Sequence, residues 1–299
     1  MKRITLTAHD GKQIAVTEYA PSGYPKGILQ IVHGMVEHAG RYDFIGNYLA
    51  SQGYLVIMDD HRGHGFTDPD TLGFCEGDMW EDTIKDLAAL SDYCHEAYPD
   101  LNLVIMGHSY GSFLTQRYIE LYPENVSGTI LGGTARMDGL QVTAGQVVAN
   151  IGWKFKGKDK PAKLIKKLTF DSYEKKLGGS FISSIPREAE RYANDSKCSF
   201  VCSYNFYKYF FKGLKSIYKK QSLACLDKDK PILIMSGDTD PVGDYGKSVK
   251  RLYETYKKAG VKDVTLRLFE GVRHEFLNDV SREVASLLIL GFLNHLCCI

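Results

Sequence analysis

Short apolar runs recur along the chain and predict its secondary structure. Apolar and polar residues alternate on both sides of the Asp-Gly pair at residues 10–11, which predicts a β-hairpin with Ile4, Leu6, Ile14 and Val16 as its apolar positions. Later runs are almost continuously apolar, as expected for buried parallel strands. These runs span residues 27–32, 54–58, 101–106, 129–131, 231–235 and 264–269.

Segments with helical spacing lie between these runs. Trp80, Ile84 and Leu87, for example, fall on one face of a helix, and Gly53 and Gly260 are expected to end two others. Alternating strands and helices predict an α/β fold with a mostly parallel central sheet flanked by helices. Such sheets bind ligands beyond the carboxyl ends of their strands, so we expect the chemistry directly after the apolar runs.

The composition is that of an ordinary globular protein. The chain has 299 residues, 44% of them hydrophobic, which excludes a disordered chain. Its longest apolar stretch, residues 284–299, contains Asn294 and His295 and is too short for a membrane span, so we expect a terminal core helix there. The N-terminal residues lack a secretory pattern, and seven cysteines cannot all pair, so we expect a cytoplasmic protein with free thiols.

The middle of the chain differs from the rest. Residues 136–224 hold 18 Lys and Arg against 7 Asp and Glu and are rich in aromatic side chains, although the whole chain has a formal charge of only +1. This shift indicates an inserted subdomain between two strands of the sheet. We therefore divide the chain into a core of residues 1–135 and 225–299 and a basic, aromatic lid of residues 136–224.

A nucleophile candidate follows the apolar run at 101–106. Residues 107–111 read Gly-His-Ser-Tyr-Gly, and a helical stretch follows at 113–121. The Gly-x-Ser-x-Gly spacing lets the backbone turn sharply and present Ser109 above the sheet, with the N-terminus of the next helix directed at developing negative charge. Ser109 is therefore the predicted nucleophile.

Serine requires a base, and the base requires a carboxylate to orient it. Asp240 follows the run at 231–235, and His274 follows the run at 264–269. Both therefore come after Ser109, and each lies at the carboxyl end of its own strand. We predict Asp240 as the acid, with Asp238 as the alternative, and His274 as the base.

Donors for an oxyanion are expected after the first parallel strand and after the nucleophile. The backbone N–H groups of Met35 and Tyr110 are the predicted pair, because Gly34 allows a close approach of the backbone. His33 is expected to shape this loop. Glu37 and Arg41, four residues apart, are expected to pair as structural support.

Together these segments resemble the α/β-hydrolase superfamily, and more narrowly its monoacylglycerol lipase and lysophospholipase branch, also called serine aminopeptidase-like. The similarity rests on the segments at 33–42, 59–65, 107–111, 237–240 and 273–275 and keeps their order along the chain. It implies an α/β-hydrolase fold with Ser109 as nucleophile, Asp240 as acid and His274 as base. Tyr110 and Ser112 depart from the residues that family members often carry, and the lid matches no motif.

The function expected from this resemblance is hydrolysis of carboxylic esters of single-chain lipids, monoacylglycerols or lysophospholipids. A short-chain or aryl esterase and an aminopeptidase with the same triad are alternatives, and a non-catalytic binding protein is the alternative of another class. An aminopeptidase would need an acidic residue near its pocket to hold the substrate's amine.

No cofactor or metal is expected. The dinucleotide-binding fingerprint is absent, and the histidines at 33, 38, 61 and 64 lack the ligand spacing of a metal site. The lysines between 154 and 167 indicate either a solvated surface or contact with an anionic membrane through the lid. Nucleic acid is not an expected partner, because no nucleic-acid-binding module is recognisable. The oligomeric state is not predicted.

Overall fold

A computed structural model describes residues 1–297 and shows one central sheet. Its strands lie in the order β1-β2-β4-β3-β5-β6-β7-β8. They are β1 (Lys2–Thr7), β2 (Gln13–Tyr19), β3 (Ile28–Val32), β4 (Leu55–Asp59), β5 (Leu103–His108), β6 (Gly128–Gly132), β7 (Ile232–Gly237) and β8 (Val264–Phe269). The first two pair antiparallel to each other, β2 is antiparallel to β4, and all later pairs are parallel.

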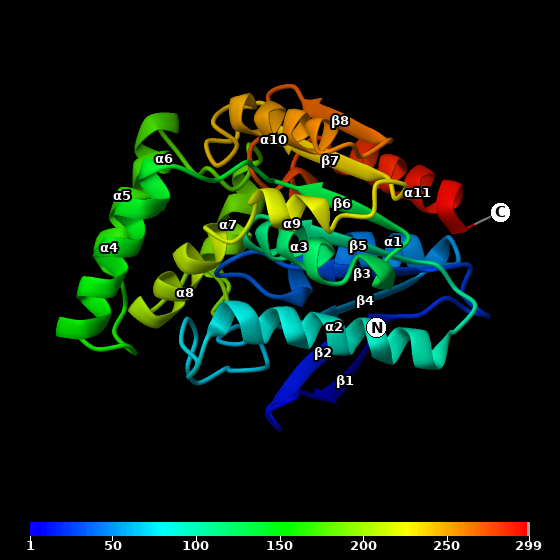
Figure 1. The fold of residues 1–299 in the computed structure, drawn as a ribbon, viewed down its shortest axis with the longest axis horizontal. Helices are drawn as coiled ribbons and strands as arrows, with labels where there is room; N and C mark the ends of the chain where they lie inside the picture. The colour runs from blue at the N-terminus through cyan, green and yellow to red at the C-terminus, as the bar shows by residue number, and fades with distance from the viewer. Residues whose placement is uncertain (298–299) are drawn as a thin grey trace.

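Helices cover both faces of this sheet (Figure 1). On one face, α2 (Met79–Ala97), α3 (Tyr110–Leu121) and α10 (Lys247–Lys258) bury a cluster that includes Trp80, Phe113 and Leu252. On the other face, α1 (Asp43–Ser51) and α11 (Arg282–Cys297) bury a second cluster that includes Leu49 and Ile289. The sheet therefore lies between two apolar cores, one on each face. This arrangement confirms the predicted α/β-hydrolase architecture.

The hairpin and the parallel strands predicted from the apolar pattern are confirmed. Ile4 pairs with Val16 and Leu6 with Ile14 across the hairpin. One detail differs, because β8 is the last strand of the sheet and its residues 265 and 267 are exposed. Alternate residues of a strand share one face of the sheet, so this face of β8 is open to solvent at the edge.

The terminal helix also differs in part from the prediction. Its buried face holds Ala285, Ile289 and Leu293, whereas Leu287 is exposed, so it covers the sheet on one side only. The last two residues of the predicted segment, Cys298 and Ile299, lie outside the described residues. Within residues 1–297 no helix combines the length and hydropathy needed to cross a bilayer.

The chain between β6 and β7 forms a helical insertion. It consists of α4 (Leu140–Phe155), α5 (Lys163–Leu168), α6 (Phe170–Leu177), α7 (Pro186–Asn194), α8 (Tyr204–Leu214) and α9 (Lys220–Ala224). Helices α4, α5 and α6 form an outer column at the left of Figure 1, and α7 and α8 lie between this column and the sheet. The insertion therefore overlaps the segment predicted as a lid.

Part of the insertion is fixed to the core by backbone hydrogen bonds. The N–H groups of His274 and Glu275 donate to the carbonyl oxygens of Phe181 and Ile182 over 3.1 and 2.8 Å. The N–H of Ser199 donates to the oxygen of Val36 over 3.0 Å. The segment around α7 is thus bound to the loops that follow β8 and β3.

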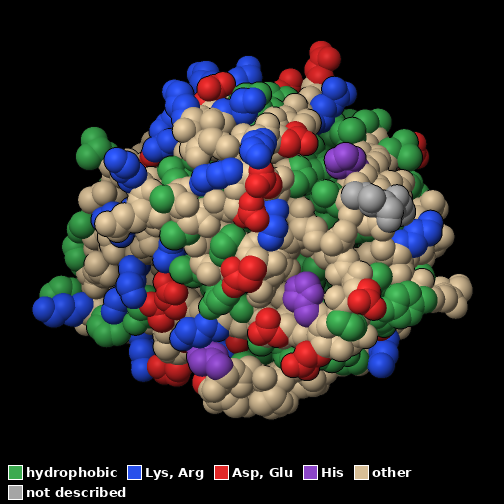
Figure 2. Space-filling model, turned by 45° about the vertical axis from the view of Figure 1, so that its right-hand side comes forward, with side chains coloured by type: hydrophobic (Ala, Val, Ile, Leu, Met, Phe, Trp, Pro, Cys, Tyr) green, Lys and Arg blue, Asp and Glu red, His purple; other side chains and the backbone are tan. Residues whose placement is uncertain are grey.

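The face that comes forward when the view of Figure 1 is turned by 45° carries charges of both signs. Figure 2 shows Lys and Arg side chains gathered toward the upper left of this face, with Asp and Glu side chains among them across its middle. Interspersed charges of this kind are ordinary for the surface of a globular protein.

Candidate active site

The predicted nucleophile lies in a strained turn between β5 and α3. Ser109 has φ of 53° and ψ of −120°, a conformation that side-chain-bearing residues seldom adopt. Its N–H donates to the oxygen of Gly132 on the neighbouring strand over 3.0 Å. A Cβ on Gly111 would collide with the backbone oxygens of Val32 and His33, so the turn requires glycine there. The strain is held in place by these contacts.

The structure brings the three predicted triad side chains together. Nε2 of His274 lies 2.8 Å from Oγ of Ser109, and Nδ1 lies 2.8 Å from Oδ2 of Asp240. Asp240 is fully buried, and its other oxygen accepts the N–H of Val242 over 2.9 Å. The carboxylate therefore fixes the imidazole so that Nε2 faces the hydroxyl.

The pKa of His274 is set by two opposing effects. Burial lowers this pKa, but the negative charge of Asp240 and its hydrogen bond raise it, and the net pKa lies above the usual value. The alternative acid, Asp238, is placed differently, because its Oδ1 accepts the N–H of Gly271 over 2.8 Å. Asp238 thus stabilises the turn after β8, and Asp240 is the carboxylate on the histidine.

A framework of histidines holds the loop after β3, which carries Met35. Val36 has φ of 57°, and its N–H donates to Nε2 of His64 over 3.2 Å. The N–H of His61 donates to Nε2 of His33 over 2.9 Å, and Nδ1 of His61 lies 2.7 Å from Oδ2 of Asp59. The predicted shaping role of His33 is therefore confirmed. The role of His64 was not predicted, although the Gly-His-Gly sequence at 63–65 marks a tight turn.

His33 and His64 accept hydrogen bonds through Nε2 and must therefore be neutral. Burial, together with the charge of His61, lowers the pKa of His64 to about 3. Burial also lowers the pKa of His33 well below its usual value. Both rings therefore remain neutral acceptors at neutral pH.

The predicted pair of Glu37 and Arg41 is wrong. Arg41 forms an ion pair with Glu275, which follows His274 in the chain. Glu37 instead accepts the N–H of Gly34 and the hydroxyl of Tyr42, the latter over 2.9 Å. Arg41 pairs with Glu275 because the fold brings the loop after β8 next to it. The distance between these residues in the sequence gives no sign of this contact. Burial, with the adjacent charge of Glu275, raises the pKa of Glu37 to about 7.

The predicted oxyanion donors lie beside the nucleophile. Met35 and Tyr110 both line the cavity that contains Ser109. Among the hydrogen bonds of residues 1–297, neither of their N–H groups donates to a protein acceptor. Both N–H groups are therefore available to an oxygen bound next to Ser109.

Two cavities meet at Ser109. The larger has a volume of about 460 Å³ and is lined mainly by apolar side chains of α4, α5, α6 and α8. The smaller has a volume of about 20 Å³, which is room for about one water molecule, and its polar lining includes Glu37, His108 and Glu275. Met35, Ser109 and Phe170 line both. The hydroxyl thus lies between a large, mainly apolar space and a small one whose walls mix polar and apolar side chains.

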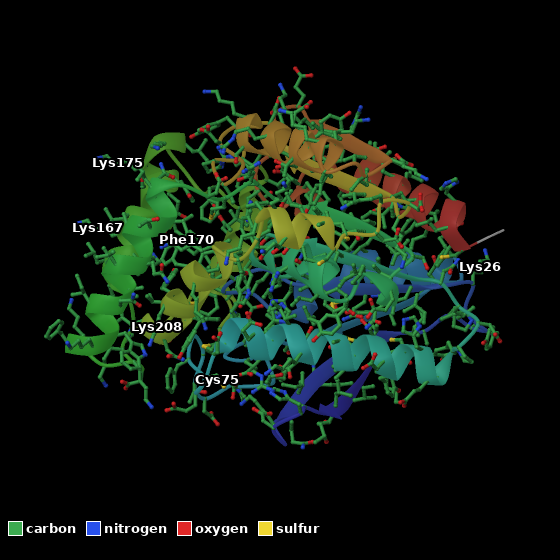
Figure 3. The ribbon with its side chains drawn as sticks, viewed as in Figure 1. Lys26, Cys75, Lys167, Phe170, Lys175 and Lys208 are labelled. Atoms are coloured by element: carbon green, nitrogen blue, oxygen red, sulfur yellow. The ribbon has the colours of Figure 1, made fainter. Side chains whose placement is uncertain are left out.

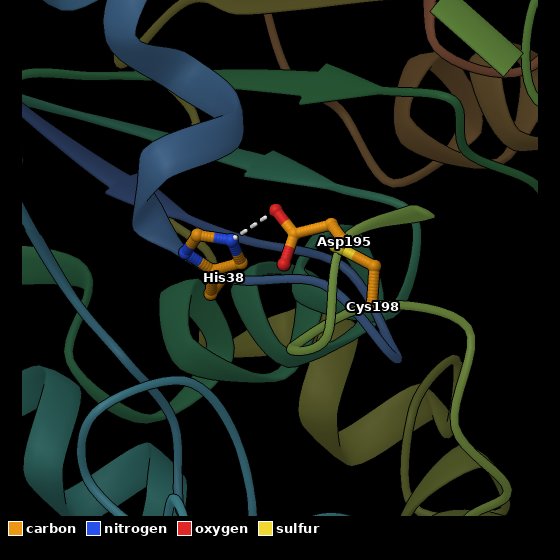
Figure 4. Close-up of side chains that lie close together, drawn as sticks. All are labelled: His38, Asp195 and Cys198. Carbon is orange, nitrogen blue, oxygen red and sulfur yellow. Dashed lines mark hydrogen bonds and ion pairs between the residues drawn. The ribbon is translucent and has the colours of Figure 1, made fainter. Parts of the chain in front are cut away.

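A cluster of His38, Asp195 and Cys198 lies beside the loop after β3 and has the residue types of a metal site (Figure 4). Its geometry suits a hydrogen bond instead. Nδ1 of His38 accepts the N–H of Gly40, so the proton of a neutral ring is on Nε2, which lies 3.0 Å from Oδ2 of Asp195. Nε2 therefore has no lone pair for a metal ion, and the pair joins the end of α7 to this loop.

The chain matches the family model "Serine aminopeptidase, S33" over residues 23–281. It is 25% identical over 288 residues to a monoglyceride lipase of Mus musculus, with 94% of this chain and 88% of the relative covered. It is 24% identical to a monoacylglycerol lipase of Mycolicibacterium smegmatis, with 92% and 90% covered.

Solved structures show the same fold. A carboxyl esterase from Bacillus coagulans, in complex with glycerol, is 28% identical with a TM-score of 0.89, covering 99% of this chain and 98% of that chain. A monoglyceride lipase from Saccharomyces cerevisiae, in complex with a substrate analog, is 18% identical with a TM-score of 0.79, covering 99% and 95%. The chain therefore belongs to the serine aminopeptidase S33 family and is an α/β hydrolase.

Proposed function

We propose that this protein is a serine carboxylic ester hydrolase that acts on single-chain lipids, as a monoacylglycerol lipase or lysophospholipase. The observation that carries the proposal is the position of Ser109 at the junction of a large apolar cavity and a small one with polar groups in its wall. His274 lies within hydrogen-bond reach of Ser109, and Asp240 within reach of His274. Esterases and monoglyceride lipases among the relatives support the same reaction class.

In the proposed mechanism, Nε2 of His274 takes the proton of Ser109 as its oxygen attacks the ester carbonyl. Asp240 stabilises the resulting imidazolium, and the N–H groups of Met35 and Tyr110 bind the oxyanion. His274 then gives its proton to the departing alcohol, which leaves an acyl-enzyme. Water, deprotonated by the same histidine, attacks this ester and releases the fatty acid.

The two cavities differ in size and lining, and we assign one to the acyl part of the ester and the other to its alcohol part. The larger cavity lies within the volume range of small-molecule sites, roughly 300–1,000 Å³, and its walls include Val148, Phe210 and Phe211. Transfer of a hydrocarbon chain from water into such a space is favourable by about 0.8 kcal/mol per methylene group. We assign it to the acyl chain, which favours a lipid ester over a short-chain or aryl ester. The small polar cavity is assigned to the alcohol and to the hydrolytic water.

An aminopeptidase is less well supported. Apart from Asp240, the carboxylates at the site are those that line the small cavity, Glu37 and Glu275, and both already have partners: Glu37 binds the N–H of Gly34, and Glu275 pairs with Arg41. Neither is left to hold the free amine of a peptide. A protein that only binds a ligand would not need a serine in a strained conformation that is hydrogen-bonded to a histidine, which is in turn hydrogen-bonded to a carboxylate.

We also propose that the insertion at 136–224 acts as a lid and that its outer face contacts lipid surfaces. In Figure 3, Lys167 and Lys175 point away from the body of the protein, whereas Phe170 points toward it. Large apolar side chains are exposed on the outer column: Leu140, Val147, Ile151, Phe155, Leu164 and Leu168. Apolar side chains flanked by lysines are typical of elements that lie in a membrane interface.

The lysines contribute less free charge than their number indicates. Three of the seven between 154 and 167 pair with carboxylates: Lys158 with Glu76, Lys160 with Asp159 and Lys166 with Asp171. We therefore expect apolar contact to dominate binding to a membrane, with electrostatic attraction second. The cytoplasmic location expected from the sequence stays a prediction.

The experiment that tests the function measures hydrolysis across p-nitrophenyl esters of increasing chain length, a monoacylglycerol and a lysophospholipid, with Ser109→Ala as control. We expect kcat/KM to rise with acyl length and to be lost in Ser109→Ala. A preference for the shortest esters would make the protein a small-molecule esterase. No hydrolysis of any ester, with no labelling of Ser109 by a fluorophosphonate, would refute the proposal.

A further inference from the structure

We propose that the side chain of Phe170 is the partition between the acyl cavity and the alcohol cavity and that it determines which alcohols the enzyme releases. This inference rests on the proposed ester hydrolysis. Of the residues that line the described cavities, Met35, Ser109 and Phe170 border both cavities at the site. Met35 and Phe170 are thus the two apolar residues of this trio, and Phe170 is the one that belongs to the insertion rather than to the loop after β3.

The partition must move because the alcohol cavity is too small for glycerol. The alcohol cavity holds about 20 Å³, which admits roughly one water molecule. A glycerol has three carbon and three oxygen atoms and cannot enter that space as it stands. A wall of the small cavity must therefore be displaced before a glycerol ester can place its carbonyl at Ser109.

Most walls of the small cavity are fixed. Glu275 pairs with Arg41, and Glu37 is bound to the loop after β3. Phe181 is held through its carbonyl oxygen, which accepts the N–H of His274 over 3.1 Å. These residues cannot withdraw without disturbing the oxyanion loop or the catalytic histidine.

Phe170 is placed differently. It is the first residue of α6, in the outer column of the insertion, and its side chain is only half buried. Its ring touches the ring of Phe181, with centroids 5.3 Å apart, and the ring of Phe181 in turn lies 5.6 Å from that of His274. A shift of α6 outward would carry Phe170 off Phe181 and join the two cavities without moving the catalytic residues.

The fixed polar groups would then face the alcohol. His108 is buried, and its Nε2 has no hydrogen-bond partner among the described residues, although it lines the small cavity. An unpaired buried nitrogen costs free energy unless a ligand or water meets it. A hydroxyl group of the alcohol could satisfy it once Phe170 has moved, which favours polyhydroxy alcohols such as glycerol over apolar ones.

The test compares three esters that share one medium-length acyl chain and differ in the alcohol: methanol, glycerol and glycerophosphocholine. Wild type, Phe170→Leu and Phe170→Ala are measured, together with Leu168→Ala. Leu168 precedes Phe170 by two residues and lines only the acyl cavity, so it is a matched control. Labelling of Ser109 by a small fluorophosphonate shows that each variant keeps its catalytic site.

We expect Phe170→Ala to raise the kcat/KM for the glycerol ester relative to the methyl ester about tenfold, because a half-buried aromatic ring need no longer be displaced. The glycerophosphocholine ester should gain at least as much, and Phe170→Leu should lie between. Leu168→Ala should leave these ratios unchanged, because it alters only the acyl side.

Unchanged ratios in both Phe170 variants, with the wild type active, would overturn the partition and leave the proposed function standing. An equal change of the ratios in Leu168→Ala would also overturn it, because the effect would then belong to the lid in general. If the wild type hydrolyses none of the esters, the proposed function itself fails, and the partition falls with it.

Discussion

Replacing Gly34 with alanine tests whether the loop after β3 supplies an oxyanion donor. The added methyl group would lie 2.5 Å from Oε1 of Glu37 and 3.1 Å from Cβ of Ser109. Both distances are shorter than the roughly 3.5–4.0 Å of a favourable contact. Glu37 can withdraw only by giving up the N–H of Gly34 and the hydroxyl of Tyr42, so the loop itself must move away from Ser109.

The expected effect follows from what this movement removes. Displacement of the loop takes the N–H of Met35, the next residue, away from the oxyanion. Loss of one such donor lowers kcat by about 10²–10³, or about 2.7–4 kcal/mol of transition-state stabilisation. Breaking the buried hydrogen bond between Glu37 and Gly34 should also lower the free energy of unfolding by about 1–3 kcal/mol.

The assay is the steady-state hydrolysis of one good ester substrate by wild type, Gly34→Ala and a matched control, Gly23→Ala. A methyl group on Gly23 would meet no atom within 4 Å, so this variant makes the same chemical change in open space. We expect kcat to fall in Gly34→Ala with a smaller change in KM, because the donor acts mainly in the transition state. Thermal unfolding of all three proteins measures the loss of stability separately.

The reasoning would be refuted by a folded Gly34→Ala protein whose kcat lies within about threefold of the wild type. Such a result would mean either that the loop absorbs the methyl group without moving or that Met35 does not donate to the oxyanion. A fall in activity of the same size in Gly23→Ala would refute it as well, since that variant leaves the loop untouched.

Further predictions concern the histidine and the lid. Because the pKa of His274 is raised and the base must be neutral, kcat/KM should be lost as the pH falls through a value above the usual 6.5 or so, and a pH–rate profile measures this limb. Asp240→Asn removes the charge that raises the pKa, so we expect kcat to fall by about 10⁴ and the acid limb of the remaining activity to move to lower pH; an unmoved limb would contradict the assignment. Phe155 is 75% exposed on the lid, so Phe155→Asp should weaken binding to lipid vesicles about tenfold, measured by co-sedimentation. Leu287→Asp on α11, where the side chain is 60% exposed, should have no such effect, and equal losses in both variants would contradict lid-directed binding.

Much of the fold was predictable because its signals are local. Strands buried on both faces require continuous apolar runs, and six such runs were enough to indicate a parallel sheet before any tertiary contact was known. The Gly-x-Ser-x-Gly spacing identified Ser109 because only glycine permits so sharp a turn at residue 111, next to the backbone of β3. The burial of β8 was overestimated, because a strand's place at the edge of a sheet is not written in its own residues.

The surroundings of the candidate site were not predictable in the same way. Neither the pairing of Arg41 with Glu275 nor the hydrogen bond from Val36 to His64 has a local signal. Each joins residues from different loops, and their spacing along the chain carries no information about their distance in space. The same holds for the contact of the α7 segment with the loop that carries His274.

The sequence by itself thus determined the order of strands and helices along the chain, the turn that presents Ser109 and the candidates for an acid and a base after later strands. Hydrophobic periodicity, glycines at tight turns and the ends of apolar runs each depend on residues close together in the chain, so the sequence alone can show them. Only the tertiary structure decided that two cavities meet at Ser109 and that Phe170 borders both of them. A cavity is bounded by side chains brought together from distant segments, and its size depends on how they pack.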